Sequence, residues 1–319
     1  MVISAIRKSV FAADLGGTHL RAAIIDEAGA ISFRVKQKTP VATADEIVRA
    51  LVSAALECEK QSGRSFHAVS VAVPGSVSLA SGSVVKAPNL RCLDGFLLAP
   101  ALTKELDRPA ILENDANAAA VGEMWRGAAR GHRTSVCVTL GTGVGGGIIL
   151  DGKLWHGVND SAAEIGHMAI DPFGGVRCTC GSVGCLEVYA SATAIVRMTR
   201  EASARFVSSI LQNTDQLTAE EVYRAGVQGD ELAREVFRRM GVCLGIGLAN
   251  LVNLLNPEMI VIAGGVANGW DLFAKDMHEQ VAERAFPIPA AQVKIVPAEC
   301  GDNAGLLGAA RLGFDSIAG

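Results

Sequence analysis

A repeated strand–turn–strand pattern constrains the fold of this chain more than any other feature of its sequence. Near the start, Asp14-Leu15-Gly16-Gly17-Thr18 follows one apolar stretch and precedes another that ends in Ile24-Ile25-Asp26. The pattern returns 125 residues later as Thr139-Leu140-Gly141-Thr142-Gly143, followed by Ile149-Leu150-Asp151. Each copy predicts two strands joined by a Gly/Thr turn. Two copies predict two α/β domains of similar topology that face each other across a cleft.

Apolar periodicity and capping signals place further elements around each copy. Strands are predicted over residues 9–13, 20–26, 31–38, 68–73, 109–112, 135–140, 147–150 and 259–263. Helices are predicted over residues 43–60, 115–129, 230–256 and 304–312. Thr43 and Glu46, like Thr218 and Glu221, have the spacing of a helix-opening capping box. Pro257 ends the long third helix because proline cannot continue it.

The length of 319 residues suits either one large domain or two ordinary ones. No linker or change of composition separates the halves. We therefore expect the domain boundary near residues 114–120, with no flexible segment across it. The predicted domains are a small N-terminal α/β domain over 1–117 and a larger α/β domain over 118–302. A C-terminal helix over about 303–319 is expected to pack on the first domain.

Composition excludes several classes of partner. The net charge of −4 gives no basic field for nucleic acid or an anionic membrane. No apolar run reaches the length of a membrane span. The N-terminus lacks the order of basic, apolar and small residues that marks a signal peptide. We therefore expect a cytoplasmic protein.

The segment from Glu164 to Glu187 contains a candidate metal site. It carries one histidine and three closely spaced cysteines: His167, Cys178, Cys180 and Cys185. Three thiolates and an imidazole form a closed tetrahedral set for zinc, with no position left for water. Gly181 and Gly184 allow the chain to turn back on the metal. We interpret the set as a structural Zn²⁺ site.

Burial and disulfide formation are the alternative interpretations of these cysteines. Disulfides suit oxidising compartments and small secreted scaffolds, and no other feature of the sequence indicates secretion. The remaining cysteines are scattered and are better read as buried small apolar residues: Cys58, Cys92, Cys137, Cys243 and Cys300.

The two glycine turns are candidate phosphate-binding loops. Backbone N–H groups of such turns bind anions, and glycine allows the main chain to approach closely. A third glycine pair, Gly264-Gly265, follows a buried strand, and Asp14 is placed to hold Mg²⁺ directly or through water. An ordinary tight turn is the alternative for each. Gly141, Gly143 and Gly146 also match the dinucleotide fingerprint, but they lead into a strand rather than a helix.

The sequence Glu113-Asn114-Asp115 lies where a buried strand meets a helix. A carboxylate there is either a helix cap or a group that lines the ligand cleft of an open α/β sheet. Phosphoryl transfer needs such a carboxylate to accept the proton of the attacking hydroxyl. If zinc rigidifies the 164–187 loop, it also fixes Glu164 and Glu187, which suits a polyol substrate.

With these residues in view, the whole chain resembles the ROK family of sugar kinases and sugar-responsive repressors, and most closely its glucokinases. The motifs that carry the resemblance are D-L-G-G-T-H-L-R, V-P-G, E-N-D-A-N-A, G-T-G-V-G-G-G-I and E-I-G-H followed by C-T-C-G-S-V-G-C-L-E. His19 departs from the first motif, where many relatives carry lysine. This departure puts the nucleotide affinity in question.

The resemblance implies a two-domain actin-like, RNase H-like α/β fold and ATP-dependent phosphorylation of a hexose 6-hydroxyl. Asp115 becomes the catalytic base. The implied sugar ligands are Gly75, Asn89, Asn114, Asp115, Glu164, His167 and Glu187. The implied ATP and Mg²⁺ ligands are Asp14, Gly16, Gly17, Thr18, Gly141, Thr142, Gly143, Gly264 and Gly265. The implied zinc ligands are His167, Cys178, Cys180 and Cys185.

The resemblance leaves the sugar and the class of function open. Glucose is favoured, which places the reaction in carbohydrate metabolism and glycolysis, while mannose, N-acetylmannosamine and N-acetylglucosamine are alternatives. A phosphoryl donor other than ATP is a further alternative. Repressors of the family carry a DNA-binding domain before the first motif, and only thirteen residues precede Asp14 here, so we expect a kinase and no nucleic-acid partner. A sugar sensor without catalysis would be expected to lack Asp115. Relatives suggest a homodimer or homotetramer.

Overall fold

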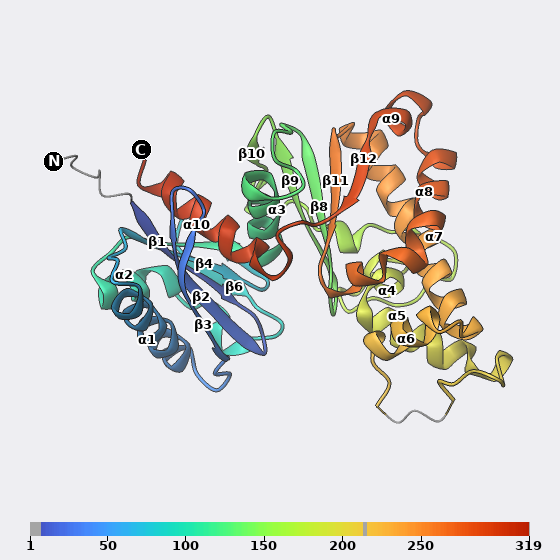
Figure 1. The fold of residues 1–319 in the computed structure, drawn as a ribbon, viewed down its shortest axis with the longest axis horizontal. Helices are drawn as coiled ribbons and strands as arrows, with labels where there is room; N and C mark the ends of the chain where they lie inside the picture. The colour runs from blue at the N-terminus through green and yellow to red at the C-terminus, as the bar shows by residue number, and fades with distance from the viewer. Residues whose placement is uncertain (1–7, 213–215, 319) are drawn as a thin grey trace. The chain divides into compact units, whose positions relative to one another are not determined.

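The computed structural model describes residues 8–212 and 216–318, which form an α/β fold built on two five-stranded sheets (Figure 1). The first sheet has the order β3-β2-β1-β4-β7, with bounds Ile31–Lys38, His19–Asp26, Ser9–Leu15, Ala68–Val73 and Ala110–Asn114. The second has the order β10-β9-β8-β11-β12, with bounds Lys153–Leu154, Val144–Leu150, Ser135–Leu140, Met259–Ala263 and Lys294–Pro297. The two orders correspond strand for strand, which confirms the repeat predicted from the sequence. The expectation that the N-terminus is not a signal peptide rests partly on residues 1–7, which lie outside the described residues.

Strand directions place both glycine turns at equivalent points of the two sheets. In the first sheet, β1 is antiparallel to β2 and parallel to β4, which is parallel to β7. In the second, β8 is parallel to β11, which is parallel to β12. The turns 16–18 and 141–143 therefore follow the carboxyl ends of β1 and β8, the edge at which open α/β sheets bind ligands.

Contacts divide the chain into two compact units. Unit 1 comprises Met1–Gly131, Gly147–Ala162 and Glu299–Gly319, and unit 2 comprises His132–Gly146 and Ala163–Ala298. The division falls inside β9. The domain boundary at residue 117 that the sequence suggests stays a prediction, since compactness alone does not define a folding domain.

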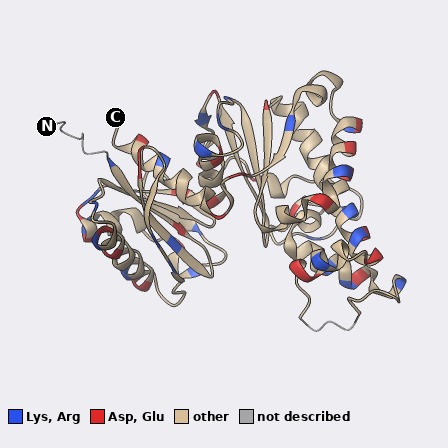
Figure 2. Ribbon diagram, in the orientation of Figure 1, with Lys and Arg blue, Asp and Glu red and all other residues tan. Residues whose placement is uncertain are grey.

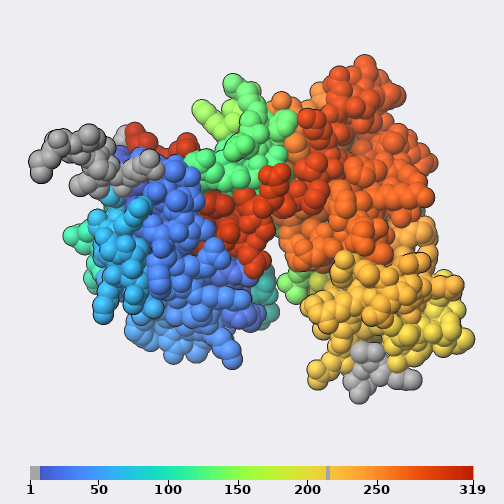
Figure 3. Space-filling view, viewed as in Figure 1, coloured from blue at the N-terminus to red at the C-terminus, as the bar shows by residue number. Residues whose placement is uncertain are grey.

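Helices cover both faces of the first sheet, because β1 and β2 are apolar on both sides. Phe11, Ala13 and Leu15 of β1 share a core with α1 (Ala44–Ser62) and α2 (Leu98–Leu106). Val10 and Ala12 face α10 (Ala304–Ser316), which also packs against α3 (Asp115–Arg126). Figure 3 shows the C-terminal segment, in red, beside the blue N-terminal segments of this unit.

Glycines permit the close approach of α3 and α10. A Cβ atom at Gly308 would lie 1.6 Å from the carbonyl oxygen of Ala118, and one at Gly122 would lie 2.1 Å from that of Ala304. The remaining elements of unit 1 are β5 (Ser76–Ser78), β6 (Ser83–Lys86), η1 (Arg91–Leu93) and η5 (Gly301–Asn303).

Unit 2 adds a helical layer to its strands. Its elements are η2 (Ile165–His167), α4 (Glu187–Ala190), α5 (Ala192–Ala202), η3 (Ser203–Arg205), α6 (Ala219–Val227), α7 (Glu231–Leu255), η4 (Gly265–Gly269), α8 (Trp270–Arg284) and α9 (Pro287–Gln292). Within this unit, the charged residues lie mostly on the helices, while β8, β9 and β11 carry none (Figure 2). Among the described residues, the longest apolar helical stretches fall short of what a bilayer span requires.

Local capping explains where the predicted helices begin and end. The Thr43 hydroxyl accepts from the backbone N–H of Glu46, and Thr218 and Glu221 form the complete reciprocal box. Asp230 caps α7, whose last turn ends at Asn256 in the left-handed region, before Pro257. Three predicted helix ends were wrong by a few residues: α1 continues to Ser62 rather than 60, α3 stops at Arg126 rather than 129, and α10 continues to Ser316 rather than 312.

Candidate functional site

The first glycine turn joins β1 to β2 and is closed by backbone and hydroxyl contacts. The Gly16 N–H donates to the His19 carbonyl at 2.9 Å, and the Thr39 hydroxyl donates to the Gly16 carbonyl at 2.6 Å. A Cβ atom at Gly17 would lie 3.0 Å from the Asn89 Cβ atom. The structure thus places the first predicted phosphate-binding turn beside Asn89, a predicted sugar ligand, within unit 1.

Asp14 lies near the end of β1, two residues before Gly16 of this turn, and it pairs with Arg21. The Arg21 Nη1 atom is 3.3 Å from Asp14 Oδ2, and Arg21 Nη2 is 3.5 Å from Asp302 Oδ2. Burial raises the pKa of Asp14 above its ordinary value, and Arg21 opposes that shift. A carboxylate is the ligand type that Mg²⁺ prefers, so Asp14 fits the predicted role.

The junction between β7 and α3 is organised by Asn114. Its side-chain oxygen accepts from the N–H groups of Ala116 at 2.9 Å and Asn117 at 3.0 Å, which makes it the cap of α3. Its Nδ2 atom donates to the Gly75 carbonyl at 3.0 Å. Gly75 has φ +111°, and a Cβ atom there would lie 2.2 Å from the Lys86 carbonyl oxygen. Asn114 therefore ties the predicted catalytic segment to the predicted V-P-G turn.

Asp115 is the first residue of α3, and its side chain is half-buried. One carboxylate oxygen accepts from the Ala116 N–H at 2.8 Å. Because Asn114 supplies the cap, Asp115 is not the N-cap residue that the alternative reading of this position required. The helix N-terminus stabilises the ionised carboxylate, which is the form that a base needs.

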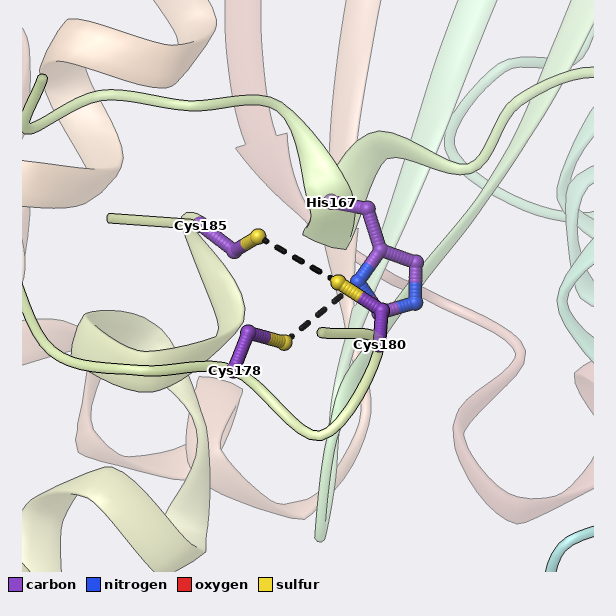
Figure 4. Close-up of side chains that lie close together, drawn as sticks. All are labelled: His167, Cys178, Cys180 and Cys185. Carbon is purple, nitrogen blue, oxygen red and sulfur yellow. Dashed lines mark hydrogen bonds between the residues drawn. The ribbon is translucent and has the colours of Figure 1, made fainter. Parts of the chain in front are cut away.

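Figure 4 shows the side chains of the candidate metal site converging on one point. The ligand atoms of His167, Cys178, Cys180 and Cys185 all lie within 4.8 Å of one another. His167 Nδ1 is 3.7 Å from Cys178 Sγ, and the sulfurs of Cys180 and Cys185 are 3.7 Å apart. Two thiolates on a tetrahedral zinc, each bonded at about 2.3 Å, are separated by about 3.8 Å. The set therefore fits zinc in both chemistry and spacing, and the cysteines are free thiols rather than disulfides.

Short backbone contacts fold the loop around this site. Cys178 donates to the Ser182 carbonyl at 2.8 Å, and Gly184 donates to the Val176 carbonyl at 2.9 Å. Gly184 has φ +75°, and a Cβ atom there would lie 1.9 Å from the Asp171 carbonyl oxygen. The glycine predicted to let the chain turn is thus required by both torsion and space.

Glu164 and Glu187 lie close to the metal site, as the sequence suggested. Glu164 Oε2 is 3.9 Å from His167 Nε2, the ring nitrogen opposite the one that faces the cysteines. Glu187 Oε2 accepts from the Val144 N–H at 2.9 Å, and a Cβ atom at Gly143 would lie 2.3 Å from the same oxygen. Glu187 therefore joins the metal loop to the second glycine turn within unit 2.

A cavity of about 420 Å³ opens beside that turn. Its lining includes three of the residues predicted to bind ATP, namely Gly141, Thr142 and Gly265. Gly264 has φ +89°, and a Cβ atom there would lie 2.4 Å from the Leu140 carbonyl oxygen, so this glycine pair packs directly on the end of β8. The structure thus brings the second and third glycine motifs together at one cavity.

Sequence reasoning missed most of the cavity wall. Helices α5 to α7 and η4 contribute its other lining residues: Ala192, Ile195, Ala219, Glu220, Tyr223, Arg224, Phe237, Val266, Asn268 and Gly269. Their spacing in the sequence is irregular, and only the complete box at Thr218 marked the start of α6. Glu220 and Arg224 form an ion pair at the exposed side. A mainly apolar wall with a few polar groups is typical of small-molecule sites.

Comparison with known proteins identifies the class to which this fold and these motifs belong. The model of the ROK family matches residues 10–315. The chain is 36% identical to a glucokinase of Halalkalibacterium halodurans over 92% of both chains, and 34% identical to a glucokinase of Thermotoga maritima over 96% of this chain and 97% of the relative. A crystal structure of a ROK family glucokinase from Streptomyces griseus, in complex with glucose and AMPPNP, superposes with a TM-score of 0.82 at 34% identity, covering 96% of this chain and 99% of that one.

The chain belongs to the ROK family. The resemblance drawn from its motifs is confirmed, and so is the actin-like α/β fold expected from it.

Proposed function

We propose that this protein is an ATP-dependent hexokinase-type phosphotransferase that converts glucose to glucose 6-phosphate. The observation that carries the proposal is the Asn114–Asp115 junction, where a capped helix presents a carboxylate of the type needed as base. The glucokinase relatives and the glucose- and AMPPNP-bound neighbour support the substrate pair. The cavity beside the second glycine turn supports a nucleotide site.

The proposed chemistry needs little covalent assistance. Asp115 accepts the proton of the sugar 6-hydroxyl as its oxygen attacks the γ-phosphorus of ATP, and ADP leaves with the bridging oxygen. The glycine turns at residues 16–18, 141–143 and 264–265 are proposed to bind the phosphates through backbone N–H groups. Mg²⁺, held by Asp14, would neutralise phosphate charge.

The proposed sugar ligands divide between the two units. Unit 1 contains Gly75, Asn89, Asn114 and Asp115, and unit 2 contains Glu164, His167 and Glu187. Carboxylates, amides and imidazole are the groups that recognise hydroxyls by paired hydrogen bonds.

We assign a structural role to zinc at His167, Cys178, Cys180 and Cys185. Four protein ligands would leave no open coordination position, so the metal would supply rigidity to the sugar-binding loop rather than a reactive site. Thiolate ligands persist in a reducing compartment, which supports a cytoplasmic location. A homodimer or homotetramer without a nucleic-acid partner completes the proposal.

A coupled ADP-release assay with Mg·ATP tests the proposal across glucose, mannose, N-acetylglucosamine and N-acetylmannosamine. We expect glucose to exceed the other sugars in kcat/KM by at least about tenfold, because each misplaced polar group in a hydrogen-bonded pocket costs a kcal/mol or more. A preference for an N-acetylhexosamine would replace glucose in the proposal. Absence of turnover with every sugar, from zinc-loaded protein, would refute the ATP-dependent kinase function and favour a sensor or another phosphoryl donor.

A further inference from the structure

A buried carboxylate directly precedes the proposed catalytic pair. Glu113, at the end of β7, is 3% exposed. Its Oε1 atom accepts from the Asn114 N–H at 3.0 Å and from Asn117 Nδ2 at 2.9 Å. Its Oε2 atom lies 2.8 Å from His156 Nε2. One carboxylate thus contacts both the residue before Asp115 and a side chain in the first turn of α3.

His156 comes from a distant segment of the same unit. It follows β10, and its carbonyl accepts from the Ala162 N–H at 3.0 Å. Asp160, in the same segment, accepts through Oδ2 from the Leu79 N–H at 2.9 Å, which anchors the segment a second time. These contacts fix where the imidazole meets Glu113.

The carboxylate beside the imidazole favours the protonated form of His156. The hydrogen bond to Glu113 raises the pKa of His156 above its ordinary value and outweighs the opposing effect of burial. The carboxylates of Glu113, from β7, and Asp160, from its own segment, are the charged groups that face it and act in the same direction. A buried carboxylate without such a partner is strongly disfavoured.

We propose that His156 is a positioning residue for phosphoryl transfer, which acts through Glu113 on the Asn114–Asp115 junction. This inference rests on the proposed function of Asp115 as base. The His156 ring holds the Glu113 carboxylate in place through their 2.8 Å contact, and Glu113 in turn holds the Asn114 main chain and the Asn117 side chain. Asn114 then caps α3 and reaches the Gly75 carbonyl, so Asp115 is held at a fixed point of the helix terminus.

Loss of the imidazolium has two consequences at the junction. Glu113 either becomes protonated, and gives up part of its acceptor capacity, or remains as an unbalanced negative charge. An unbalanced negative charge two residues from Asp115 disfavours the ionised form of its carboxyl group. A smaller fraction of Asp115 can then act as base at low pH. A small displacement of Asp115 lowers the rate further, because proximity effects depend steeply on geometry.

The test compares His156→Gln with His132→Gln. His132 is a matched control: its side chain has the same exposed fraction, 25%, and it also pairs with a glutamate, Glu258, at 3.8 Å. Neither His132 nor Glu258 is a proposed ligand of the sugar, the nucleotide or the metal. For His156→Gln we expect kcat with glucose to fall by about tenfold or more, with KM for ATP changed less than about twofold. The acid limb of its pH–kcat/KM profile moves upward by about half a pH unit.

A charge-rescue variant separates positioning from simple damage to the fold. In the double variant Glu113→Gln, His156→Gln the buried charge is removed while an amide oxygen remains to accept from the Asn114 N–H. We expect the kcat of the double variant to be at least about threefold higher than that of His156→Gln. The acid limb of its pH profile should return toward that of the wild type. Circular dichroism and zinc content, measured for each variant, identify those that fold.

The outcomes distinguish the inference from the function on which it rests. Wild-type turnover, with a loss confined to His156→Gln and rescue in the double variant, supports the inference. Wild-type turnover with unchanged kcat and pH profile in His156→Gln overturns the inference alone. An equal loss in His132→Gln, or no rescue in a folded double variant, also overturns it. A wild-type protein without turnover refutes the proposed function, and the inference with it.

Discussion

Replacement of Cys180 by serine tests whether the cysteine–histidine cluster is a metal site that shapes the sugar-binding loop. Cys180 is the exposed cysteine of the cluster, so serine fits without repacking a core. A serine hydroxyl is a poor zinc ligand at neutral pH, whereas a thiolate is a strong one. The change therefore removes one of four ligands and leaves the chain otherwise as it was.

The expected loss of zinc affinity follows from the number of protein ligands, which is four. Structural zinc sites bind with about 10–16 kcal/mol, so an equal share for one ligand is about 3 kcal/mol. That share corresponds to zinc affinity weakened by about two orders of magnitude. Without the metal, the loop is held by backbone bonds such as Cys178 to Ser182 and Gly184 to Val176. His167 then loses its fixed orientation, and we expect KM for glucose to rise by about tenfold or more while KM for ATP changes little.

The assay combines metal analysis after dialysis against a weak chelator with glucose titration by calorimetry. Cys92→Ser is the control, since Cys92 lies in unit 1 and outside the cluster. Full zinc retention in Cys180→Ser would refute the ligand assignment. Loss of zinc with unchanged glucose affinity would refute the coupling between the metal and the sugar-binding loop.

Four further perturbations test other parts of the account. Asp115→Asn is expected to lower kcat by about 10²–10⁴-fold with glucose binding largely kept, and near-normal turnover would exclude it as base. Ala219→Phe places a ring at the cavity wall; KM for ATP should rise by about tenfold with KM for glucose unchanged, and the reverse pattern would move the nucleotide elsewhere. Gly75→Ala should cost about 2–4 kcal/mol more of unfolding free energy than Gly131→Ala, since both have positive φ but only Gly75 meets a backbone oxygen; equal costs in urea melts would contradict this. Asp26 is buried, which raises its pKa, but backbone N–H bonds and Arg64 outweigh burial and hold that pKa below its ordinary value. Its stabilising effect is therefore present above the unfolded-state pKa near 4 and is lost as pH falls through the lower folded value, so Asp26→Asn should cost about 1–3 kcal/mol at pH 7 and progressively less below pH 4. A cost that does not change with pH would contradict the assigned cause.

The sequence predicted the elements whose pattern is strong over their whole length. The buried strands β4, β8 and β11 match their predicted bounds residue for residue, because short, mainly apolar runs that stop at a nearby glycine or proline leave little choice of end points. The long α7 matched because Asp230 and Asn256 mark its two ends. The cluster of His167, Cys178, Cys180 and Cys185 could be expected because three cysteines and a histidine within one short segment match the donor set of a structural zinc site.

Short elements and sites assembled from distant segments were not predictable in this way. The hairpin of β5 and β6 and the edge strand β12 have three or four residues each, too few to show a period of two. The cavity wall combines four separate elements. His156 had no sequence signal at all, because its role depends on Glu113, which lies 43 residues away in the chain. Tertiary structure alone brings these groups together.

The most direct test of the central claim is phosphorus NMR of the products formed from glucose and Mg·ATP. We expect one new phosphomonoester whose phosphorus signal is coupled to the C6 methylene protons of glucose. It should accumulate in equal amount with ADP and be absent with Asp115→Asn. Inorganic phosphate with ADP as the only products, or a phosphoryl group on another hydroxyl, would contradict phosphoryl transfer to the 6-hydroxyl with Asp115 as base.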